Sequence, residues 1–212
     1  MLRLYLARHG RTVWNQEGRN QGQGDSPLDA VGSLQSQCLA EHLASLGLTD
    51  IYSSDLGRCL QTAATLGALT SLQPKVDTRL RERDYGEWEG ITADDAERTH
   101  PEEWKAYRQD PSLHSPPGGE SGIEVFMRAS HFLFDLLDAH REGSIAIVAH
   151  GGVIAAMCAA LLHGTPKTAA CIRVPNCSVT EIEIDVNGRR RLVRFNDVEH
   201  LEAVPSEAAS LG

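Results

Sequence analysis

The chain alternates short apolar runs with segments whose apolar residues recur at helical spacing. Continuous apolar runs end at Ala7 and Val148, and runs of this length are typical of buried strands. Shorter runs predict strands over 50–53 and 75–77, and spacings of three and four residues predict helices over about 34–46 and 57–69. Strands that alternate with helices favour a mostly parallel sheet covered on both faces, so we expect an α/β fold built as a three-layer α/β/α sandwich. The first predicted helix places Leu34, Cys38, Leu39, Leu43 and Leu46 on one face.

The alternation stops between residues 83 and 120. This segment is rich in charged residues and proline and contains Trp88, Trp104 and Tyr107. We interpret it as a small cap inserted into one domain that spans residues 1–212, a length sufficient for one full-sized core.

The alternation resumes after the cap. Ser121 and Glu124 form a capping-box pattern that opens a long helix. A strand then precedes His150, and a helix is predicted over 152–163. Asn187-Gly188 is typical of a type I′ turn and predicts a hairpin over 178–195. The tail after Glu199 is expected to be poorly ordered.

Composition and charge exclude several classes of partner. The net charge of −9 argues against a nucleic acid or an anionic membrane, because both would repel this chain. The basic run at 189–191 follows the predicted turn and is explained as a solvated hairpin edge. The apolar stretch 145–162 is divided by His150, Gly151 and Gly152 into a strand and a helix, so we expect no membrane span. The five cysteines show no C-x-x-C spacing, which favours a reducing, cytoplasmic setting.

Two histidines follow the two longest predicted strands. His9 lies in Arg8-His9-Gly10 after the first apolar run, and His150 lies in Ala149-His150-Gly151 after the second. In an open α/β sheet the carboxyl ends of strands line the crevice where ligands bind. We therefore expect the two rings to face each other across one pocket.

Five motifs in order extend this picture from Met1 to about Leu201, and together they make the chain resemble the histidine phosphatase superfamily in its phosphoglycerate mutase-like branch. The motifs are Arg8-His9-Gly10-Arg11-Thr12-Val13-Trp14-Asn15; Gln21-Gly22 with Asp25-Ser26-Pro27-Leu28; Ser53-Ser54-Asp55-Leu56-Gly57-Arg58; Leu80-Arg81-Glu82 with Gly86, Trp88, Glu89 and Gly90; and His150-Gly151.

The resemblance implies catalysis through a phosphohistidine. It makes His9 the nucleophile. It makes Arg8, Arg58 and His150 the residues that bind the phosphoryl oxygens, and arginine suits this role because its planar guanidinium binds two oxygens at once and stays charged. It makes Glu82 the proton donor to the leaving oxygen and then the acceptor from water. The residues alone leave other interpretations open: a core histidine for His9, a surface arginine for Arg58, and a salt bridge from Glu82 to Arg79, Arg81 or Arg83.

Further positions follow from the same resemblance. Arg11 departs from the family, which commonly has an acidic residue there; it adds charge for a second anionic group or points to solvent. His200 lies in a segment that resembles the one returning towards the site in phosphatase members. The resemblance implies no metal and no cofactor, and no nucleotide-loop or His-Glu-x-x-His zinc motif is present. Phosphate and substrate contacts are expected from Thr12, Asn15, Gln21, Gly22, Tyr85 and Gly151.

Three functions fit these residues. The first is a phosphatase that hydrolyses phosphomonoesters of small metabolites. The second is a phosphoglycerate mutase, which Glu82-Arg83-Asp84-Tyr85-Gly86 favours. The third is a non-catalytic phosphate-binding module, disfavoured because the whole catalytic set is present. The cap looks too short to exclude water as a mutase must, so hydrolysis is preferred. The expected partner is a small phosphorylated metabolite, and a homodimer is left open. Specificity would come from Tyr85, Trp88, Trp104, Lys105, Tyr107, Arg108 and His114.

Overall fold

The computed structural model describes residues 1–204, and its centre is a mixed sheet with strand order β3-β2-β4-β1-β5-β6. The four strands β3, β2, β4 and β1 run parallel, while β5 and β6 are antiparallel to their neighbours. The predicted mostly parallel sheet is confirmed. The strands are β1 (Leu2–Arg8), β2 (Asp50–Ser53), β3 (Lys75–Val76), β4 (Gly143–Ala149), β5 (Val179–Ile184) and β6 (Arg190–Asp197).

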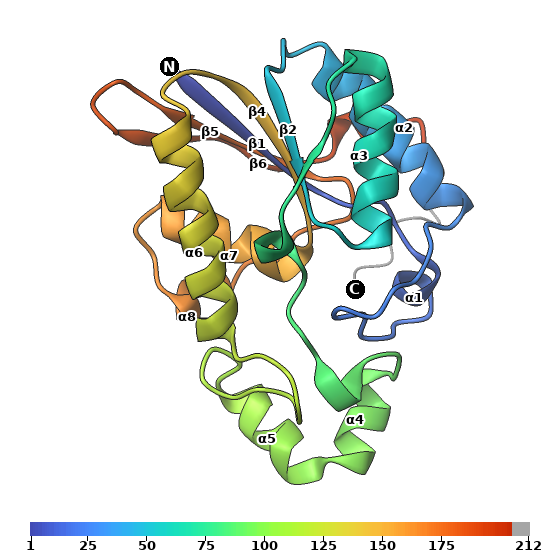
Figure 1. Ribbon diagram of the computed structural model, residues 1–212. Helices are drawn as coiled ribbons and strands as arrows, with labels where there is room; N and C mark the ends of the chain where they lie inside the picture. Colours follow the sequence, from blue (N-terminus) through green and yellow to red (C-terminus); the bar gives the residue numbers. More distant parts are fainter. Residues whose placement is uncertain (205–212) are drawn as a thin grey trace.

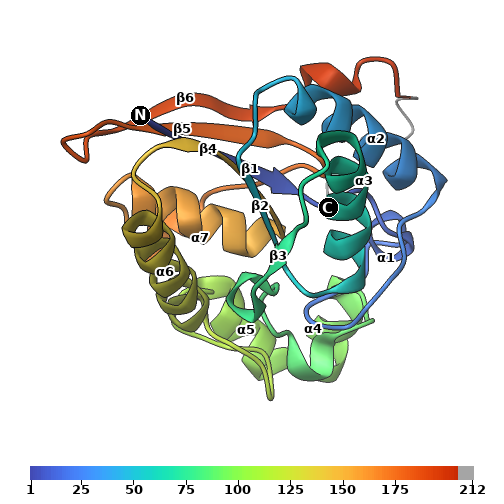
Figure 2. The same cartoon turned by 45° about the horizontal axis from the view of Figure 1, so that its top comes forward.

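Helices cover both faces of the sheet, as Figures 1 and 2 show. One layer contains α2 (Ala30–Ala44) and α3 (Gly57–Thr70). The other contains α6 (Gly122–Ala139) and α7 (Gly151–Leu161), with the short α8 (Pro166–Ala169) beside them. This is the predicted three-layer sandwich. The Ser121–Glu124 capping box is present at the start of α6.

The central strands β1 and β4 are mostly apolar because each of their faces is covered. On β1, Leu4 and Leu6 point into the core on the α6–α7 side, while Tyr5 and Ala7 point into the core on the α2–α3 side. Successive side chains of a strand alternate between faces, so two covered faces require a continuous apolar run. The burial of both faces fixes β1 and β4 at the middle of the molecule, where the site lies.

The helix α2 begins at Ala30, four residues before the predicted start, and the face that it buries was predicted only in part. Leu39 and Leu43 are buried as expected. Leu34 is 50% exposed, whereas Gln35 and Ser36 are buried. Polar residues occupy this face because Gln35 Oε1 accepts the backbone N–H of Arg11 at 2.9 Å. The helix therefore supports the loop that follows β1.

The segment expected to form a cap contains three short elements: η2 (Gly86–Trp88), α4 (Ala93–Thr99) and α5 (Pro101–Gln109). Figure 1 places α4 and α5 beyond the end of the sheet, with α4 on the side of α1 (Val13–Gln16) and α5 below α6. Trp88 is fully buried, with its ring centroid 5.2 Å from the rings of both Trp104 and Tyr107. The guanidinium of Arg19 donates to the carbonyl oxygen of Gly90 at 2.7 Å and links this segment to the end of α1. A further 3-10 turn, η1 (Thr78–Leu80), precedes it.

One expectation about the C-terminal part was wrong, and a second is contradicted only in part. The hairpin turn is not type I′, because Gly188 has a positive φ and Asn187 does not. Three residues separate Asp185 from Arg189, and Gly188 N–H donates back to Asp185, which fits a three-residue loop with glycine in the left-handed position. The tail after Glu199 forms η3 (Glu199–Leu201) against α2; its residues 205–212 lie outside the described ones.

The helix after His150 begins and ends slightly earlier than predicted, at Gly151 and Leu161. Over residues 1–204, no helix has both the length and the apolar character needed to cross a membrane. The basic hairpin edge is confirmed in part by its contacts: Arg191 pairs with Glu183 across β5 and β6 at 3.4 Å.

Candidate active site

The parallel pairing of β1 with β4 brings the two predicted histidines together. Arg8 is in register with Ala149, so His9 and His150 follow the two strands at the same edge of the sheet. Their ring centroids are 5.1 Å apart with an interplanar angle of 61°. The exposed fractions are 2% and 0%. The predicted juxtaposition of the two rings is confirmed.

The ring of His9 is held in one tautomer. Its Nδ1 lies 2.8 Å from the carbonyl oxygen of Gly10. A carbonyl oxygen only accepts, so Nδ1 carries the proton and Nε2 has a free lone pair. Burial lowers the pKa of His9 well below its usual value, and the charges of Arg58 and Arg8 lower it further. At neutral pH the ring is therefore an uncharged imidazole, the form that can act as a nucleophile.

His150 is held in the opposite tautomer. Arg58 Nε, which only donates, lies 3.2 Å from Nδ1, so Nδ1 accepts and Nε2 carries the proton. Nε2 donates to Ser54 Oγ at 2.9 Å, with Cys59 Sγ 3.3 Å from the same nitrogen. Burial, followed by the charge of Arg58, lowers the pKa of His150 well below its usual value. That His150 becomes a cation beside bound phosphate stays a prediction.

Arg58 lies in the first turn of α3 and is only 1% exposed; the alternative of a surface arginine is wrong. Nη1 donates to the carbonyl oxygen of Gly24 at 2.8 Å, and Nη2 donates to that of Gly22 at 2.6 Å. Gly22 has a φ of +55°, and a side chain there would collide with the carboxylate of Glu89. Glycine at position 22 thus shapes the turn that holds the guanidinium.

Arg8 approaches the same centre from the last position of β1. Its Nη1 donates to the carbonyl oxygen of Val174 at 2.6 Å. Its Nε is buried, and no partner for it lies among residues 1–204. A Cβ on Gly151 would lie 3.7 Å from this guanidinium. The first turn of α7 thus lies beside Arg8, and the buried Nε–H of Arg8 can serve an anionic group.

Glu82 lies against the first turn of α7. Oε1 accepts the backbone N–H of Arg83 at 2.8 Å, and Oε2 accepts that of Gly152 at 3.2 Å. Within the described residues its carboxylate makes no salt bridge, so that alternative is wrong: Arg79 pairs with aspartates, Arg81 pairs with Asp55, and Arg83 binds carbonyl oxygens. The carboxylate is held only by backbone donors, so it is not committed to a cation.

Thr12 and Asn15 form a reciprocal cap on α1. Thr12 Oγ1 accepts the N–H of Asn15 at 3.1 Å, and Asn15 Oδ1 accepts the N–H of Thr12 at 3.2 Å. Asn15 Oδ1 also accepts from Asn176 Nδ2 at 3.2 Å. Sequence reasoning missed Asn176. The sequence carried no signal for it, because only the antiparallel pairing of β5 with β1 places the residues before β5 next to those after β1.

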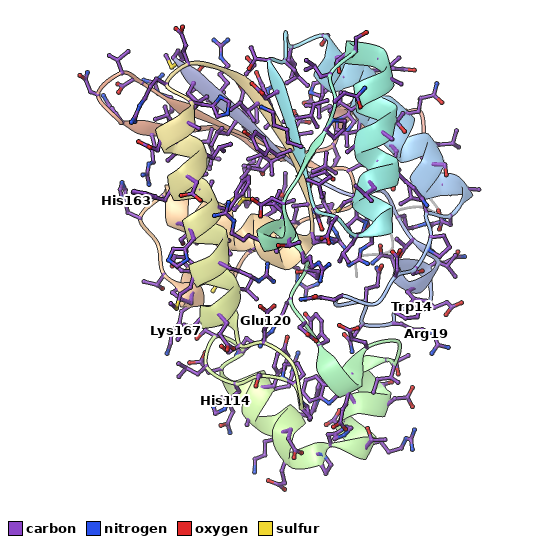
Figure 3. The ribbon with its side chains drawn as sticks, in the orientation of Figure 1. Trp14, Arg19, His114, Glu120, His163 and Lys167 are labelled. Carbon is purple, nitrogen blue, oxygen red and sulfur yellow. The ribbon has the colours of Figure 1, made fainter. Side chains whose placement is uncertain are left out.

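A cavity of about 190 Å³ lies between the cap and the first turns of α7. Tyr85 and Tyr107 line it together with Arg83, and the cavity reaches Gly151 and Gly152. The other specificity candidates do not line it: Trp88 is in the interior, Trp104 packs on Trp88, and Lys105, Arg108 and His114 are exposed. Figure 3 shows His114 and Glu120 on the connection between α5 and α6; their carbonyl oxygens accept from Arg83 at 2.8 and 2.6 Å.

Two remaining predicted residues lie at the margin. Gln21 is 8% exposed, and no partner for its buried Oε1 is present within residues 1–204. Arg11 does not point to solvent: it is 6% exposed and donates from Nε to Asp29 at 2.7 Å. Its charge is already matched by this carboxylate. In the part of the chain that the structure describes, no group of three or more His, Cys, Asp or Glu side chains could hold a metal ion.

Comparisons with known proteins agree with this geometry. Over 168 residues the chain is 39% identical to glucosyl-3-phosphoglycerate phosphatase of Mycobacterium tuberculosis, which covers 76% of this chain and 75% of that protein. Over 189 residues it is 38% identical to the probable phosphoglycerate mutase GpmB of Salmonella paratyphi B, with coverage of 86% and 85%. The alpha-ribazole phosphatase from Shigella flexneri superposes with a TM-score of 0.87 at 27% identity, over 92% of this chain and 96% of that one. The model of the histidine phosphatase superfamily (branch 1) matches residues 4–198, and the chain belongs to this superfamily.

Proposed function

We propose that this histidine phosphatase hydrolyses phosphomonoesters of small metabolites by passing the phosphoryl group from the substrate to His9 and then to water. One observation carries the proposal: a neutral imidazole with a bare Nε2 is buried beside the guanidinium groups of Arg8 and Arg58. The family and two phosphatase relatives support this chemistry.

In the first step Nε2 of His9 attacks phosphorus, and the bond from phosphorus to the ester oxygen breaks. Arg8, Arg58 and Asn15 supply donors to the phosphoryl oxygens, because catalysis of phosphoryl transfer depends on positioning and on charge stabilisation. His150 joins them once it is protonated, since in the neutral ring Nδ1 accepts from Arg58 and Nε2 donates to Ser54. An alkoxide is a poor leaving group, so Glu82, as the carboxylic acid, gives its proton to the departing oxygen.

In the second step water attacks the phosphohistidine. Glu82, now a carboxylate, accepts a proton from this water, the bond between phosphorus and Nε2 breaks, and inorganic phosphate leaves. His9 regains its lone pair and Glu82 its proton. The two backbone N–H groups that hold Glu82 serve both halves, since neither requires the carboxylate to leave its place.

The alcohol part of the substrate would lie in the cavity under the cap. This cavity adjoins Gly152, whose N–H donates to the carboxylate of Glu82. An alcohol bound in the cavity would therefore have its ester oxygen near Glu82. Arg83 lies over the ring of Tyr107 at 4.8 Å and over that of Tyr85 at 5.8 Å. Aromatic faces with one guanidinium suit a compact, partly apolar alcohol that offers a hydrogen-bond acceptor.

A mutase is the second candidate, because the GpmB relative is named a probable phosphoglycerate mutase. A mutase must keep water from the phosphohistidine until a second hydroxyl accepts the group. Here the segment over the site has only two short helices, α4 and α5, and we expect it to admit water. Hydrolysis is therefore the preferred function.

Setting and assembly also belong to this proposal. All five cysteines are free thiols, and one of them, Cys59, contacts His150, so we propose a reducing compartment such as the cytoplasm. A homodimer stays a prediction, which static light scattering of the purified protein would test.

The decisive experiment is a metal-free assay with a chelator over a panel of small phosphomonoesters, run beside mutase assays with and without 2,3-bisphosphoglycerate. We expect phosphate release by the wild type, an acid-labile phosphoryl label trapped during turnover, and loss of both in His9→Ala to below about one thousandth of the wild-type rate. His131→Ala, at an exposed histidine on α6, is the matched control. Isomerisation without phosphate release would favour the mutase, and full turnover by His9→Ala would exclude the mechanism.

A further inference from the structure

We propose that Asn176 is a positioning residue that turns the side-chain amide of Asn15 so that its N–H groups face the transferring phosphoryl group. The inference rests on the proposed function, in which Asn15 contacts that group. Asn176 lies in the loop between α8 and β5, and sequence motifs gave it no role. Its Nδ2 contacts two segments at once, the end of β1 and the start of α1.

The hydrogen-bond partners fix the orientation of both amides. The carbonyl oxygen of His9 only accepts, so the Asn176 atom 3.0 Å from it must be Nδ2. The backbone N–H of Thr12 only donates, so the Asn15 atom 3.2 Å from it must be Oδ1. The second hydrogen of Asn176 Nδ2 then goes to Asn15 Oδ1 at 3.2 Å. Each orientation is therefore set by a backbone group.

The consequence concerns the free end of Asn15. Its Oδ1 accepts two hydrogen bonds, from Thr12 and Asn176, which uses both lone pairs. Only the NH₂ end is left for a ligand. An amide free to flip could present its oxygen to the negatively charged phosphoryl oxygens. The backbone N–H of Thr12 and the amide of Asn176 together prevent this, so Asn176 helps to preorganise the donor before the reaction begins.

The loop that carries Asn176 contacts the site at neighbouring positions too. The carbonyl oxygen of Val174 accepts from Arg8, and Cys177 N–H donates to the carbonyl oxygen of Arg8 at 3.1 Å. The cause is the topology: β5 runs antiparallel to β1, with Ala7 in register with Val179. Three residues before Val179 the chain must pass beside His9, and there an asparagine side chain can reach both His9 and Asn15.

The test compares Asn176→Ala, which removes both donors, with Asn176→Asp, which keeps the shape and replaces the donors by acceptor oxygens. In the Asp variant the new carboxylate attracts the NH₂ end of Asn15 away from the site. We expect kcat/KM to fall about 10-fold for Asn176→Ala and about 100-fold for Asn176→Asp, with the inhibition constant for inorganic phosphate rising in the same order. Asn187→Ala and Asn187→Asp, in the exposed hairpin turn, are the matched controls and should leave both constants unchanged.

A merely structural role would give a different result in a double-mutant cycle. If Asn176 acts through Asn15, then in an Asn15→Ala background Asn176→Ala should lower kcat/KM by less than about twofold. A full, additive loss in that background would overturn the proposal, as would unchanged constants in folded Asn176→Asp. Should Asn176→Ala fail to fold, the near-isosteric Asp variant decides alone. The wild type and His9→Ala run in the same assay, and their result tests the proposed function separately.

Discussion

Arg58 supports the site through its hydrogen bonds as well as through its charge. One N–H holds the tautomer of His150, and two more reach the carbonyl oxygens of Gly24 and Gly22. A lysine ammonium is a single point with no planar fork, so it cannot satisfy the three at once. The geometry of the two histidines therefore depends on the guanidinium as much as the phosphoryl group does.

This dependence predicts a large effect of a charge-conserving substitution. Arg58→Lys should lower kcat/KM about 100-fold or more, because Nδ1 of His150 loses its donor and the phosphoryl group loses a two-point contact. Steady-state kinetics would measure it. Arg98→Lys, at an exposed arginine that pairs with Asp95 on α4, is the control. An Arg58→Lys enzyme within about threefold of wild type would contradict this role.

His9, the proposed nucleophile, is also predicted to titrate at unusually low pH. Burial, then Arg58 and Arg8, lowers the pKa of His9, so His9 should stay neutral through about pH 6.5, where a free histidine is half protonated. Removing one positive charge by Arg58→Met should raise this pKa towards its ordinary value. NMR of ring-labelled histidine would follow the titration directly. An unchanged His9 pKa in Arg58→Met would show that Arg58 has no part in the shift.

At the scale of elements, the first turn of α7 holds Glu82, the proposed catalytic acid, through the N–H of Gly152. A Cβ on Gly152 would lie 2.6 Å from Glu82 Oε1, whereas one on Gly151 would have only ordinary contacts at 3.7 Å or more. Gly152→Ala should therefore displace Glu82 and lower kcat by about 10-fold. Alanine also favours a helix over glycine by about 0.5–1 kcal/mol, so unfolding should show little loss of stability.

The comparison with Gly151→Ala makes this prediction specific, because both variants change the same turn of the same helix. A smaller kinetic loss is expected at 151. Equal losses in the two variants, or a Gly152→Ala protein that is strongly destabilised, would show that general disruption of α7 explains the effect.

The elements themselves could be predicted from sequence far better than their contacts. Apolar runs and helical spacing gave the strands β1 and β4 and the helices α2, α3 and α6, because burial on one or two faces leaves a periodic trace. The apolar part of the face that α2 buries was predicted, but its polar part was not, since Gln35 is buried by a partner distant in sequence, the backbone of Arg11. The prediction of the hairpin turn type was also wrong, because Asn-Gly occurs in more than one type of turn.

The same limit applies to the site. His9, His150, Arg58 and Glu82 were found because they belong to motifs, and the structure brings them together. The supporting residue Asn176 belongs to no motif. Its role becomes visible only when the antiparallel pairing of β5 with β1 is known.

At the scale of the whole molecule, the buried histidines link folding to pH. The pKa values of His9, His150 and His200 are all lowered, with burial the largest cause in each case. His200 donates from Nε2 to the carbonyl oxygen of Cys177 at 2.9 Å, and its ring stacks on His42 at 4.9 Å. Its Nδ1 is buried without a partner among residues 1–204. Protonation of His200 would therefore place a buried N–H⁺ at Nδ1 with no hydrogen-bond acceptor among the described residues.

The sign of the pH dependence follows from these three shifts. Because the folded-state pKa of each histidine is lower than its value of about 6.5 in the unfolded chain, the unfolded state binds more protons once the pH falls below that value. Stability should be fully present above about pH 7 and decline as the pH falls from 6.5 towards 5, before most carboxylates titrate. Each fully buried histidine can contribute up to about 1.4 kcal/mol per pH unit in this window. Urea unfolding at pH 7.5, 6.5 and 5.5 would measure the decline, and His200→Gln, which keeps a donor but cannot be protonated, should make it shallower. Equal stability of the wild type at pH 7.5 and 5.5 would mean that these rings become protonated without leaving their buried places.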